Sequence, residues 1–352
     1  MARALWARLS RSRDEGDADR TSGSSTQLMH ATIRIVGQGI AGSLLAWACE
    51  RKGIECEIID RGHAEAASRM GAGLVSPLTG QRLVPTWRFP EWAERARGLY
   101  GELEAELGLA LVRPMRLRRL YRTAQQRERM EAKLGVPEVA AWVESADAQG
   151  LWLRGAFQVD TARLIAGLRQ RWLGKGWLTE RSVDGDEPSA RATIWCVGAG
   201  VQETDLAAAK WELSKGEILT GRLVGLKEDV LLNDGQWVLP IGSESVRVGA
   251  TFNRNDLRLV PSAAAEIELR AAAERLGGRP IESGEMGVGL RVNVADRRPV
   301  VGWRDDAKRW GIFAGLAAKG ALWAPILAEQ WAADGLMGGA LEGEVSPARF
   351  QK

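Results

Sequence analysis

TIRIVGQGIAG, residues 32–42, is the stretch of sequence that decides the fold. Residues 32–36 form a short β-branched run, and the glycine turn GQGIAG follows directly. Apolar residues then recur at helical spacing, at Ile40, Leu44, Leu45 and Ala48. This order of strand, glycine turn and helix predicts a dinucleotide-binding unit.

The residues of this turn have separate physical roles. Gly37 permits the tight turn, Gly39 lets the backbone approach a pyrophosphate, and Gly42 lets the helix pack closely on the strand. Ile40 and Ala41 open the helix, whose free N–H groups and positive dipole end attract phosphate. We expect all five residues to bind a dinucleotide, although a glycine turn alone also fits a purely structural role.

An acidic residue follows at the spacing that such a site requires. Residues 55–59 form a second strand that ends in Asp60, 18 residues after Gly42. There the carboxylate can accept both ribose hydroxyls of an adenosine, and we place the adjacent Arg61 in the same site. Because this carboxylate would repel a 2′-phosphate, NADP is disfavoured.

Composition limits the class of protein. The chain has 352 residues, of which 45% are apolar and 26% charged, as is typical of a soluble globular protein with about two domains. A net charge of +3 is too small to indicate a polyanionic partner by itself. No apolar run reaches the roughly 18 residues of a membrane span. The three cysteines, an odd number without metal-ligand spacing, predict reduced core thiols, a cytoplasmic location and no metal site: Cys49, Cys56 and Cys196.

The N-terminal segment differs from the rest of the chain. Residues 1–29 mix Arg, Asp, Ser and Gly without hydrophobic periodicity, and they lack the apolar centre of a secretory signal. We expect a disordered extension. Met29 stands just before the first strand, so it is an alternative translation start.

Patterns beyond the first unit predict a mixed architecture. Helical spacing covers residues 90–108, 160–174, 261–276 and 319–333. Strands are expected at 115–122, at 192–197 before the glycines Gly198 and Gly200, and at 311–313. Short β-rich segments broken by Gly, Pro and Asn favour an antiparallel sheet: 217–224, 230–232, 236–241 and 245–251.

Several motifs further along carry a family resemblance. Residues 67–77 read ASRMGAGLVSP, and GAFQVD (155–160), VLP (238–240) and VGAT (248–251) follow. The later motifs are GLR (289–291), DRRP (296–299), GLAAKG (315–320) and AP (324–325). In this order the chain resembles the D-amino-acid oxidase and glycine oxidase superfamily of FAD enzymes. The closing motif most resembles the FAD oxidase half of the bifunctional wobble-uridine tRNA modification enzymes, whose methyltransferase half has no counterpart here.

The resemblance implies an α/β fold in two parts. A Rossmann-like FAD-binding domain with a central parallel sheet would be assembled from residues 30–86, 156–212 and 286–345. An α+β substrate domain with an antiparallel sheet would be inserted as residues 87–155 and 213–285. The resemblance also implies further cofactor-binding residues: Ser68, Ala72, Gly73, Leu74, Gly198, Gly200, Gly315, Ala317, Ala318, Lys319 and Gly320.

Two basic residues are the catalytic candidates. Arg291 matches the arginine that pairs with the substrate carboxylate in amino-acid-oxidising relatives. The competing interpretation is an arginine that pairs with Asp296 or another acid in a core network. Lys319, beside the flavin in the family, would stabilise negative charge on the reduced ring. Its competing interpretation is a solvated lysine at a helix start.

Residue types that are scarce also constrain the chemistry. The only histidines, His30 and His63, stand outside the expected reactive region, which favours oxidation of an amine over an alcohol that needs a base. A carboxylate, tyrosine or lysine base stays open. No cysteine or histidine matches the covalent attachment sites of relatives, so we expect FAD to bind noncovalently. Arg247 stands where some relatives have an oxygen-activating lysine, which leaves O2 or another electron acceptor open.

Two compositional features have mainly structural interpretations. Most of the fifteen tryptophans fall on apolar helix faces, and Trp87, Trp92 and Trp237 are the candidates to line a pocket. Residues 113–133 hold eight basic and two acidic side chains. We expect a solvated face there, with a nucleic-acid contact as the alternative.

The sequence therefore predicts an FAD-dependent oxidoreductase that oxidises the C–N bond of a small amine or amino acid. The alternatives are oxidation of an aminomethyl group on a tRNA base, and an FAD-binding module without catalytic activity.

Overall fold

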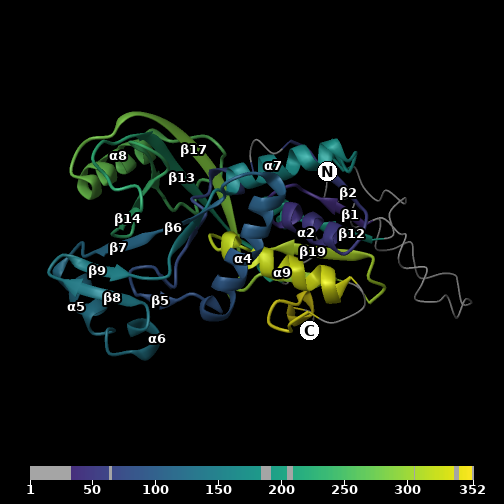
Figure 1. Ribbon diagram of the computed structural model, residues 1–352, viewed down its shortest axis with the longest axis horizontal. Coiled ribbons are helices and arrows are strands. Elements are labelled where there is room, and N and C mark those ends of the chain that lie inside the picture. Colours follow the sequence, from purple (N-terminus) through teal and green to yellow (C-terminus); the bar gives the residue numbers. More distant parts are fainter. Residues whose placement is uncertain are drawn as a thin grey trace, which may run out of the picture.

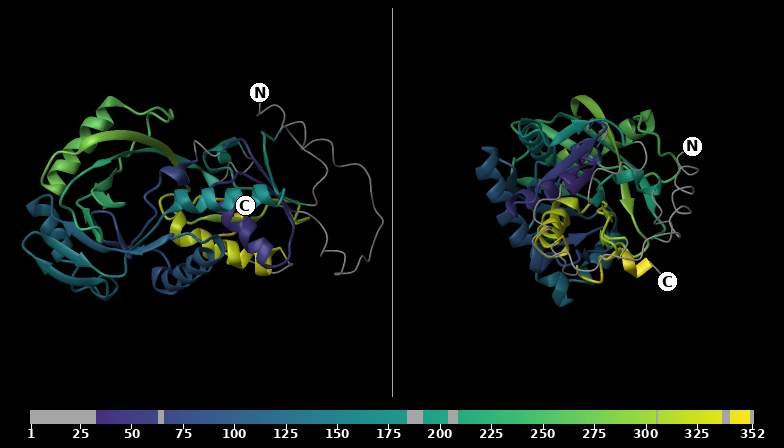
Figure 2. Two further views of the ribbon diagram at one scale, coloured as in Figure 1. Left: turned by 45° about the horizontal axis from the view of Figure 1, so that its top comes forward. Right: turned by 90° about the vertical axis from the view of Figure 1, so that its right-hand side faces the viewer.

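The computed structural model describes residues 33–62, 66–183, 192–203, 209–304, 306–336 and 341–350. The expected N-terminal extension and both histidines lie outside these residues. Two large sheets form the two ends of the molecule, as Figure 1 shows. The turned views in Figure 2 show the C-terminal segment packed beside the N-terminal unit.

A six-stranded sheet contains the predicted dinucleotide unit. Its strand order is β11-β2-β1-β12-β19-β18, and every pair is parallel except β18 with β19. Strand β1 lies inside the sheet, between β2 and β12. It is buried on both faces, as expected for a β-branched run in a parallel sheet. The strands are β1 (Ile33–Val36), β2 (Cys56–Asp60), β11 (Leu178–Glu180), β12 (Ala192–Trp195), β18 (Val300–Trp303) and β19 (Trp310–Ala314).

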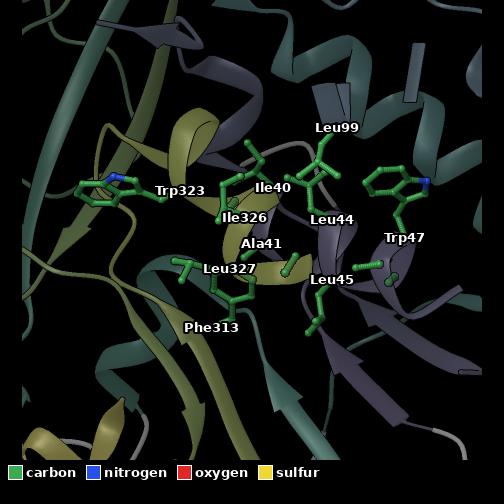
Figure 3. Close-up of a cluster of buried hydrophobic side chains, with 14 of the residues drawn as sticks. Ile40, Ala41, Leu44, Leu45, Trp47, Leu99, Phe313, Trp323, Ile326 and Leu327 are labelled. Atoms are coloured by element: carbon green, nitrogen blue, oxygen red, sulfur yellow. The ribbon is translucent and has the colours of Figure 1, made fainter. Parts of the chain in front are cut away.

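Helices bury the apolar faces of this sheet. Helix α2 (Ile40–Arg51) packs against α9 (Gly320–Gln330), and α4 (Phe89–Leu107) packs against α9 in turn. Figure 3 shows Leu44 and Leu45 of α2 facing Ile326 and Leu327 of α9, with Leu99 of α4 nearby. Helix α7 (Thr161–Gly174) contacts α2, and the Asp160 side chain caps its first turn. The N-terminal unit and the last helix thus share one core.

An eight-stranded, mostly antiparallel sheet forms the other end of the molecule. Its order is β17-β13-β16-β15-β14-β7-β9-β8, with only β14 and β7 parallel. Helix α8 (Ala263–Gly277), capped by Ser262, covers one face. The strands are β7 (Arg116–Leu120), β8 (Val143–Asp147), β9 (Gly150–Leu153), β13 (Glu212–Arg222), β14 (Val230–Asn233), β15 (Trp237–Pro240), β16 (Ser245–Gly249) and β17 (Glu282–Asn293).

Smaller elements connect the two large sheets. A three-stranded sheet, β3-β10-β6, contains β3 (Leu74–Val75), β6 (Val112–Pro114) and β10 (Phe157–Val159). Strands β4 (Leu78–Thr79) and β5 (Val84–Pro85) pair beside it. Three short helices, a π-helical turn and two 3-10 turns complete the described elements: α3 (Ala67–Met70), α5 (Ala124–Glu131), α6 (Pro137–Ala140), Trp331–Gly335, Gly198–Glu203 and Pro347–Phe350.

The predicted fold class, a parallel sheet with an added antiparallel sheet, is confirmed. The exact division into five segments stays a prediction, and β17 crosses its expected boundary at residue 286. The hairpin of β8 and β9 and most of β17 were not anticipated. None of the described helices is long and apolar enough to cross a membrane.

The basic run at residues 113–133 departs from the expected solvated face. Arg118 and Arg119 on β7 are 5% and 4% exposed, so that interpretation is wrong for these two residues. Arg118 pairs with Asp147 at 2.6 Å and lies over the Trp152 ring. Strand β7 has neighbours on both edges, and both of its faces are covered at these positions.

Candidate functional site

A cavity of about 1310 Å³ lies where the two large sheets meet. This volume exceeds the usual range for small-molecule pockets, which leaves room for a dinucleotide together with a small substrate. Nearly all predicted site residues line it: Gly37, Gly39, Ile40, Ala41, Asp60, Arg61, Ser68, Ala72, Gly73, Leu74, Gly198, Gly200, Arg291, Ala317, Ala318, Lys319 and Gly320. Gly42 and Gly315 do not line the cavity and support the backbone behind it.

The glycine turn is held rigidly at one end of the cavity. Gly37 has a φ of +100°, and a Cβ atom there would lie 2.5 Å from the carbonyl oxygen of Cys196. Its N–H donates to the Ile59 carbonyl at 2.8 Å. A Cβ atom on Gly42 would lie 1.9 Å from the Gly37 carbonyl oxygen. The close packing of helix on turn that the sequence predicted is therefore present.

The carboxylate of Asp60 faces this turn. Its Oδ2 atom accepts from the Gln38 N–H at 2.7 Å, and its Oδ1 atom accepts from the Gly62 N–H at 3.0 Å. Arg169 of α7 lies 3.5 Å from Oδ1 and donates to the Gln38 side-chain oxygen at 3.0 Å. Sequence reasoning missed Arg169 and Gln38, since no local motif joins residues 131 positions apart.

The second predicted loop closes over the start of helix α2. The hydroxyl oxygen of Ser68 accepts from the Ile40 N–H at 3.2 Å. Thr161 donates its hydroxyl to the Ser68 carbonyl at 2.6 Å, which fixes the loop to α7. Gly73 has a φ of +64°, and a Cβ there would lie 1.8 Å from the Val159 carbonyl oxygen. The glycines thus bring two loops and a helix end together around an open space, which fits an extended dinucleotide.

Arg291 lies on β17 with its guanidinium in the cavity. Its side chain crosses Gly216, where a Cβ atom would lie 2.2 Å from Nη2. Both terminal nitrogens donate to one carbonyl oxygen, that of Thr251, at 3.2 and 3.3 Å. Burial lowers the pKa of Arg291. No carboxylate lies within ion-pair distance of it among the described residues.

The competing interpretation of Arg291, a pair with Asp296, is wrong. The Asp296 carboxylate pairs with Arg349 at 2.7 Å and accepts from the Arg298 N–H at 3.0 Å. Asp296 therefore holds its own loop.

Lys319 stands at the N-cap of α9 and lines the cavity. Its Nζ atom donates to the Thr86 hydroxyl at 3.2 Å. Burial, and secondarily the charge of Arg119, lowers the pKa of Lys319 to about 8. The alternative of a solvated lysine at a helix start is therefore wrong.

Arg119 is a cavity residue that sequence reasoning did not single out. Its Nη1 atom donates to the Asn233 side-chain oxygen at 2.7 Å, and its buried Nε atom has no hydrogen-bond partner in the described structure. Burial lowers the pKa of Arg119 to about 10. Arg119 belongs to a run of arginines in the sequence. The structure shows that it is the one of the adjacent pair Arg118 and Arg119 that lines the cavity.

The remaining candidates are distributed between the cavity and the core. Trp237 lines the cavity, Trp87 lines a neighbouring pocket, and Trp92 is 5% exposed in the core. Arg247 donates to the Gly71 carbonyl at 3.1 Å. All three cysteines are buried free thiols, and the described residues contain no cluster that could hold a metal ion.

A second pocket of about 600 Å³ adjoins the cavity and shares Lys319 and residues 79–81 with it. Two tryptophans line it, and its remaining charged residues are all arginines: Arg82, Arg129, Arg297 and Arg298. Within the described ranges none of these four arginines has an acidic partner at ion-pair distance. Arg298 lies over the Trp87 ring at 4.7 Å.

A family model and curated relatives match most of this chain. The family model DAO, described as FAD dependent oxidoreductase, matches residues 32–334. The chain is 30% identical over 328 residues to the tRNA 5-methylaminomethyl-2-thiouridine biosynthesis bifunctional protein MnmC of Maricaulis maris, covering 87% of this chain and 52% of that protein. The protein of the same name from Caulobacter vibrioides is 28% identical, with 85% and 53% covered. The chain thus spans about half the length of these curated relatives.

Two solved structures share the fold. Iminodiacetate oxidase from a Chelativorans species has a TM-score of 0.72 and 22% identity, covering 90% of this chain and 98% of that chain. Glycine oxidase from Geobacillus kaustophilus has a TM-score of 0.73 and 19% identity, covering 88% and 96%.

Proposed function

Because the chain belongs to the DAO family of FAD-dependent oxidoreductases, we propose that it oxidises the C–N bond of a small amine or amino acid, with FAD bound noncovalently. Bound FAD supplies the two-electron acceptor for the hydride. The observation that carries the proposal is the guanidinium of Arg291, which lies half-buried at the cavity with no carboxylate partner among the described residues.

The unfilled hydrogen-bonding capacity of Arg291 is what favours a carboxylated substrate. A guanidinium has five N–H donors in a rigid fork, and here the two terminal nitrogens share a single carbonyl acceptor. A carboxylate can accept two parallel N–H bonds from such a fork. Gly216 leaves room for the guanidinium, because a Cβ atom at this position would clash with Nη2.

The residues around the cavity favour an amine over an alcohol. Asp60 is the one acidic side chain among its described lining residues, and its two oxygens already accept from the Gln38 and Gly62 N–H groups. No described lining residue is a histidine or tyrosine. An amine can enter neutral and lose hydride without a base, whereas an alcohol commonly needs one. Lys319, with a pKa of about 8, is the remaining group that can exchange a proton near neutral pH.

The position of Arg247 bears on the final electron acceptor. Arg247, at the position of an oxygen-activating lysine in some relatives, is engaged with the Gly71 carbonyl. We propose O2 as the default acceptor, with another oxidant as the alternative. Comparing reoxidation rates in air and with an artificial acceptor distinguishes the two.

The test begins with the flavin. Flavin released by heat should be FAD, and an amine panel should then bleach the bound flavin anaerobically. Arg291→Ala should keep FAD but bind carboxylated amines about 10- to 100-fold more weakly, the usual effect of losing charge-assisted hydrogen bonds. The exposed Arg116→Ala is the matched control.

Two results would contradict this assignment. Loss of FAD from Arg291→Ala would mean that the arginine supports the cofactor site and not the substrate. Bleaching by dithionite but by none of the amines would favour an FAD-binding module without this activity.

A second candidate is oxidation of an aminomethyl group on a tRNA base. Its support is the arginine-lined pocket beside the cavity, since unpaired cations near aromatic rings suit phosphate and base contacts. The relatives named for tRNA modification point the same way. The predicted basic run is a poorer probe, because Arg118 and Arg119 are buried.

This candidate has its own test. Salt-sensitive tRNA binding should weaken when Arg82, Arg129 and Arg297 are replaced together by Ser. The same number of exposed arginines replaced elsewhere, at Arg163, Arg222 and Arg254, should have little effect. Equal binding by both triple variants would remove this candidate.

A further inference from the structure

Arg119 is a buried cation that the chemistry at Arg291 does not use. It is 4% exposed and lines the cavity, and its side-chain hydrogen-bond partner among the described residues is the neutral amide of Asn233. Its Nε–H donor is buried without an acceptor in the described structure. A buried charge with an unsatisfied hydrogen-bond donor costs folding free energy unless a ligand supplies the missing acceptor, so the presence of Arg119 calls for an explanation.

The groups around Arg119 do not neutralise it. Asp234 is the nearby acid, but its carboxylate pairs with Arg275 at 2.7 Å and accepts from the Gln236 N–H at 3.2 Å. Lys319 lines the same cavity, and its amine donates to the Thr86 hydroxyl. Two cations whose charges interact therefore line the cavity, and both donate to neutral partners.

We propose that Arg119 and Lys319 form a second anion-binding subsite, which takes a carboxylate or phosphate that the amine substrate carries away from its reacting C–N bond. This inference rests on the proposed function, with Arg291 binding the first carboxylate. The substrate class is thereby an amine with two anionic groups. Asn233 is the positioning residue, since its oxygen holds both Arg119 and the Gly235 N–H, the latter at 2.9 Å.

The two subsites lie on different strands of one sheet. Arg291 is on β17 and Arg119 on β7, five inter-strand steps apart in the sheet order. Each step measures about 4.8 Å along a sheet. A substrate as short as glycine would leave Arg119 and Lys319 without an anion, whereas a longer diacid could fill both subsites.

The test uses the FAD-loaded protein and a series of N-substituted glycines. N-(ω-carboxyalkyl)glycines and N-(ω-phosphonoalkyl)glycines with two to eight methylenes are compared with uncharged N-alkylglycines of equal length. Affinity is read from the flavin spectrum and from anaerobic reduction. We expect at least one charged ligand to bind tenfold or more tightly than its uncharged analogue, and the two charged series decide between carboxylate and phosphate.

Variants then assign the preference. Arg119→Gln should remove the difference in affinity (the gap) between charged and uncharged ligands, while Arg116→Gln on the same strand should leave this difference unchanged. Asn233→Asp keeps the arginine but gives it an internal carboxylate, so it should also shrink the gap while the protein remains folded. Asn233→Asp thereby separates loss of the subsite from loss of the fold.

The outcomes separate this inference from the proposed function. Simple α,ω-dicarboxylates need no oxidation to perturb the flavin spectrum. If they bind in an Arg119-dependent way while no amine reduces the flavin, the subsite stands and amine oxidation fails. If amines reduce the flavin but charged and uncharged analogues bind equally, the second subsite is refuted.

Discussion

Replacing Gly42 by Ala should strongly weaken the binding of FAD. The new Cβ atom would lie 1.9 Å from the Gly37 carbonyl oxygen, so the turn must retreat by about 1.5 Å to reach an ordinary contact of 3.4 Å. That turn is fixed, because the Gly37 N–H bonds to Ile59 and the space beside its Cα is filled by Cys196. Overpacking of this kind costs about 1–3 kcal/mol, against about 1 kcal/mol gained in helix propensity.

The effect on FAD should exceed the effect on stability. A shift of this size would misplace at least two N–H donors aimed at the pyrophosphate, each worth about 1.5–3 kcal/mol to a charged group. We therefore expect the dissociation constant for FAD to rise more than 100-fold while the apoprotein loses about 2 kcal/mol or less. Flavin fluorescence titration and urea unfolding of the apoprotein measure the two quantities.

A matched substitution controls for the chemistry. Gly98 also lies in a helix, α4, and a Cβ atom there meets nothing within 4 Å. Gly98→Ala should gain up to about 1 kcal/mol and leave FAD binding unchanged. The reasoning is refuted if Gly42→Ala binds FAD within threefold of the parent, or if both variants lose FAD equally.

Four further predictions concern the charged residues of the cavity. Asp60→Asn should weaken FAD binding about 10- to 100-fold, since it removes a charged acceptor from the glycine turn; an unchanged dissociation constant would exclude the role in cofactor binding. With the pKa of Lys319 lowered to about 8, carboxylate ligands should bind more weakly as pH rises through 8, and Lys319→Gln should abolish this step. The unfolded chain holds this proton up to about pH 10.4, so the same lysine should make apoprotein stability rise between those pH values relative to Lys319→Gln. Arg119→Met should stabilise the apoprotein by about 1 kcal/mol or more in urea unfolding, because a buried charge without a carboxylate is removed; a loss of 1 kcal/mol would show that the arginine supports the fold.

The dinucleotide unit was predictable because its signals are local. Strand β1, the glycine turn and helix α2 follow one another, and the structure displays a steric reason for Gly37 and Gly42. The helices predicted at 160–174 and 261–276 also have local signals, since the capping side chains of Asp160 and Ser262 bond within their own first turns.

Strand β17 shows where sequence patterns fail. Its segment contains Gly284, Gly287 and Gly289, which are poor strand formers, and strand formation here depends on pairing with β13 along most of its length. The same glycines admit bulky neighbours: a Cβ on Gly287 would lie 2.7 Å from the Met70 sulfur. A pattern of residue types cannot show a partner strand about seventy positions away.

The prediction of a solvated face was wrong for Arg118 and Arg119 of β7 for another reason. A strand normally presents charge on one face only, so adjacent charged residues indicate exposure. Here Arg118 is covered by its Asp147 pair and the Trp152 ring, while Arg119 faces the cavity. Burial of both depends on elements on either side of the strand, which the strand's own sequence does not encode.

The strand order of the six-stranded sheet has a consequence for biosynthesis. Strand β1, near the N-terminus, pairs with β12, and β12 pairs with β19 close to the C-terminus. At about 5–20 residues per second, the ribosome completes β19 roughly 14–55 s after β1. Through that interval the apolar faces of β1 and α2 lack their final partners, so we expect the nascent chain to depend on chaperones and FAD to associate only after translation has nearly ended.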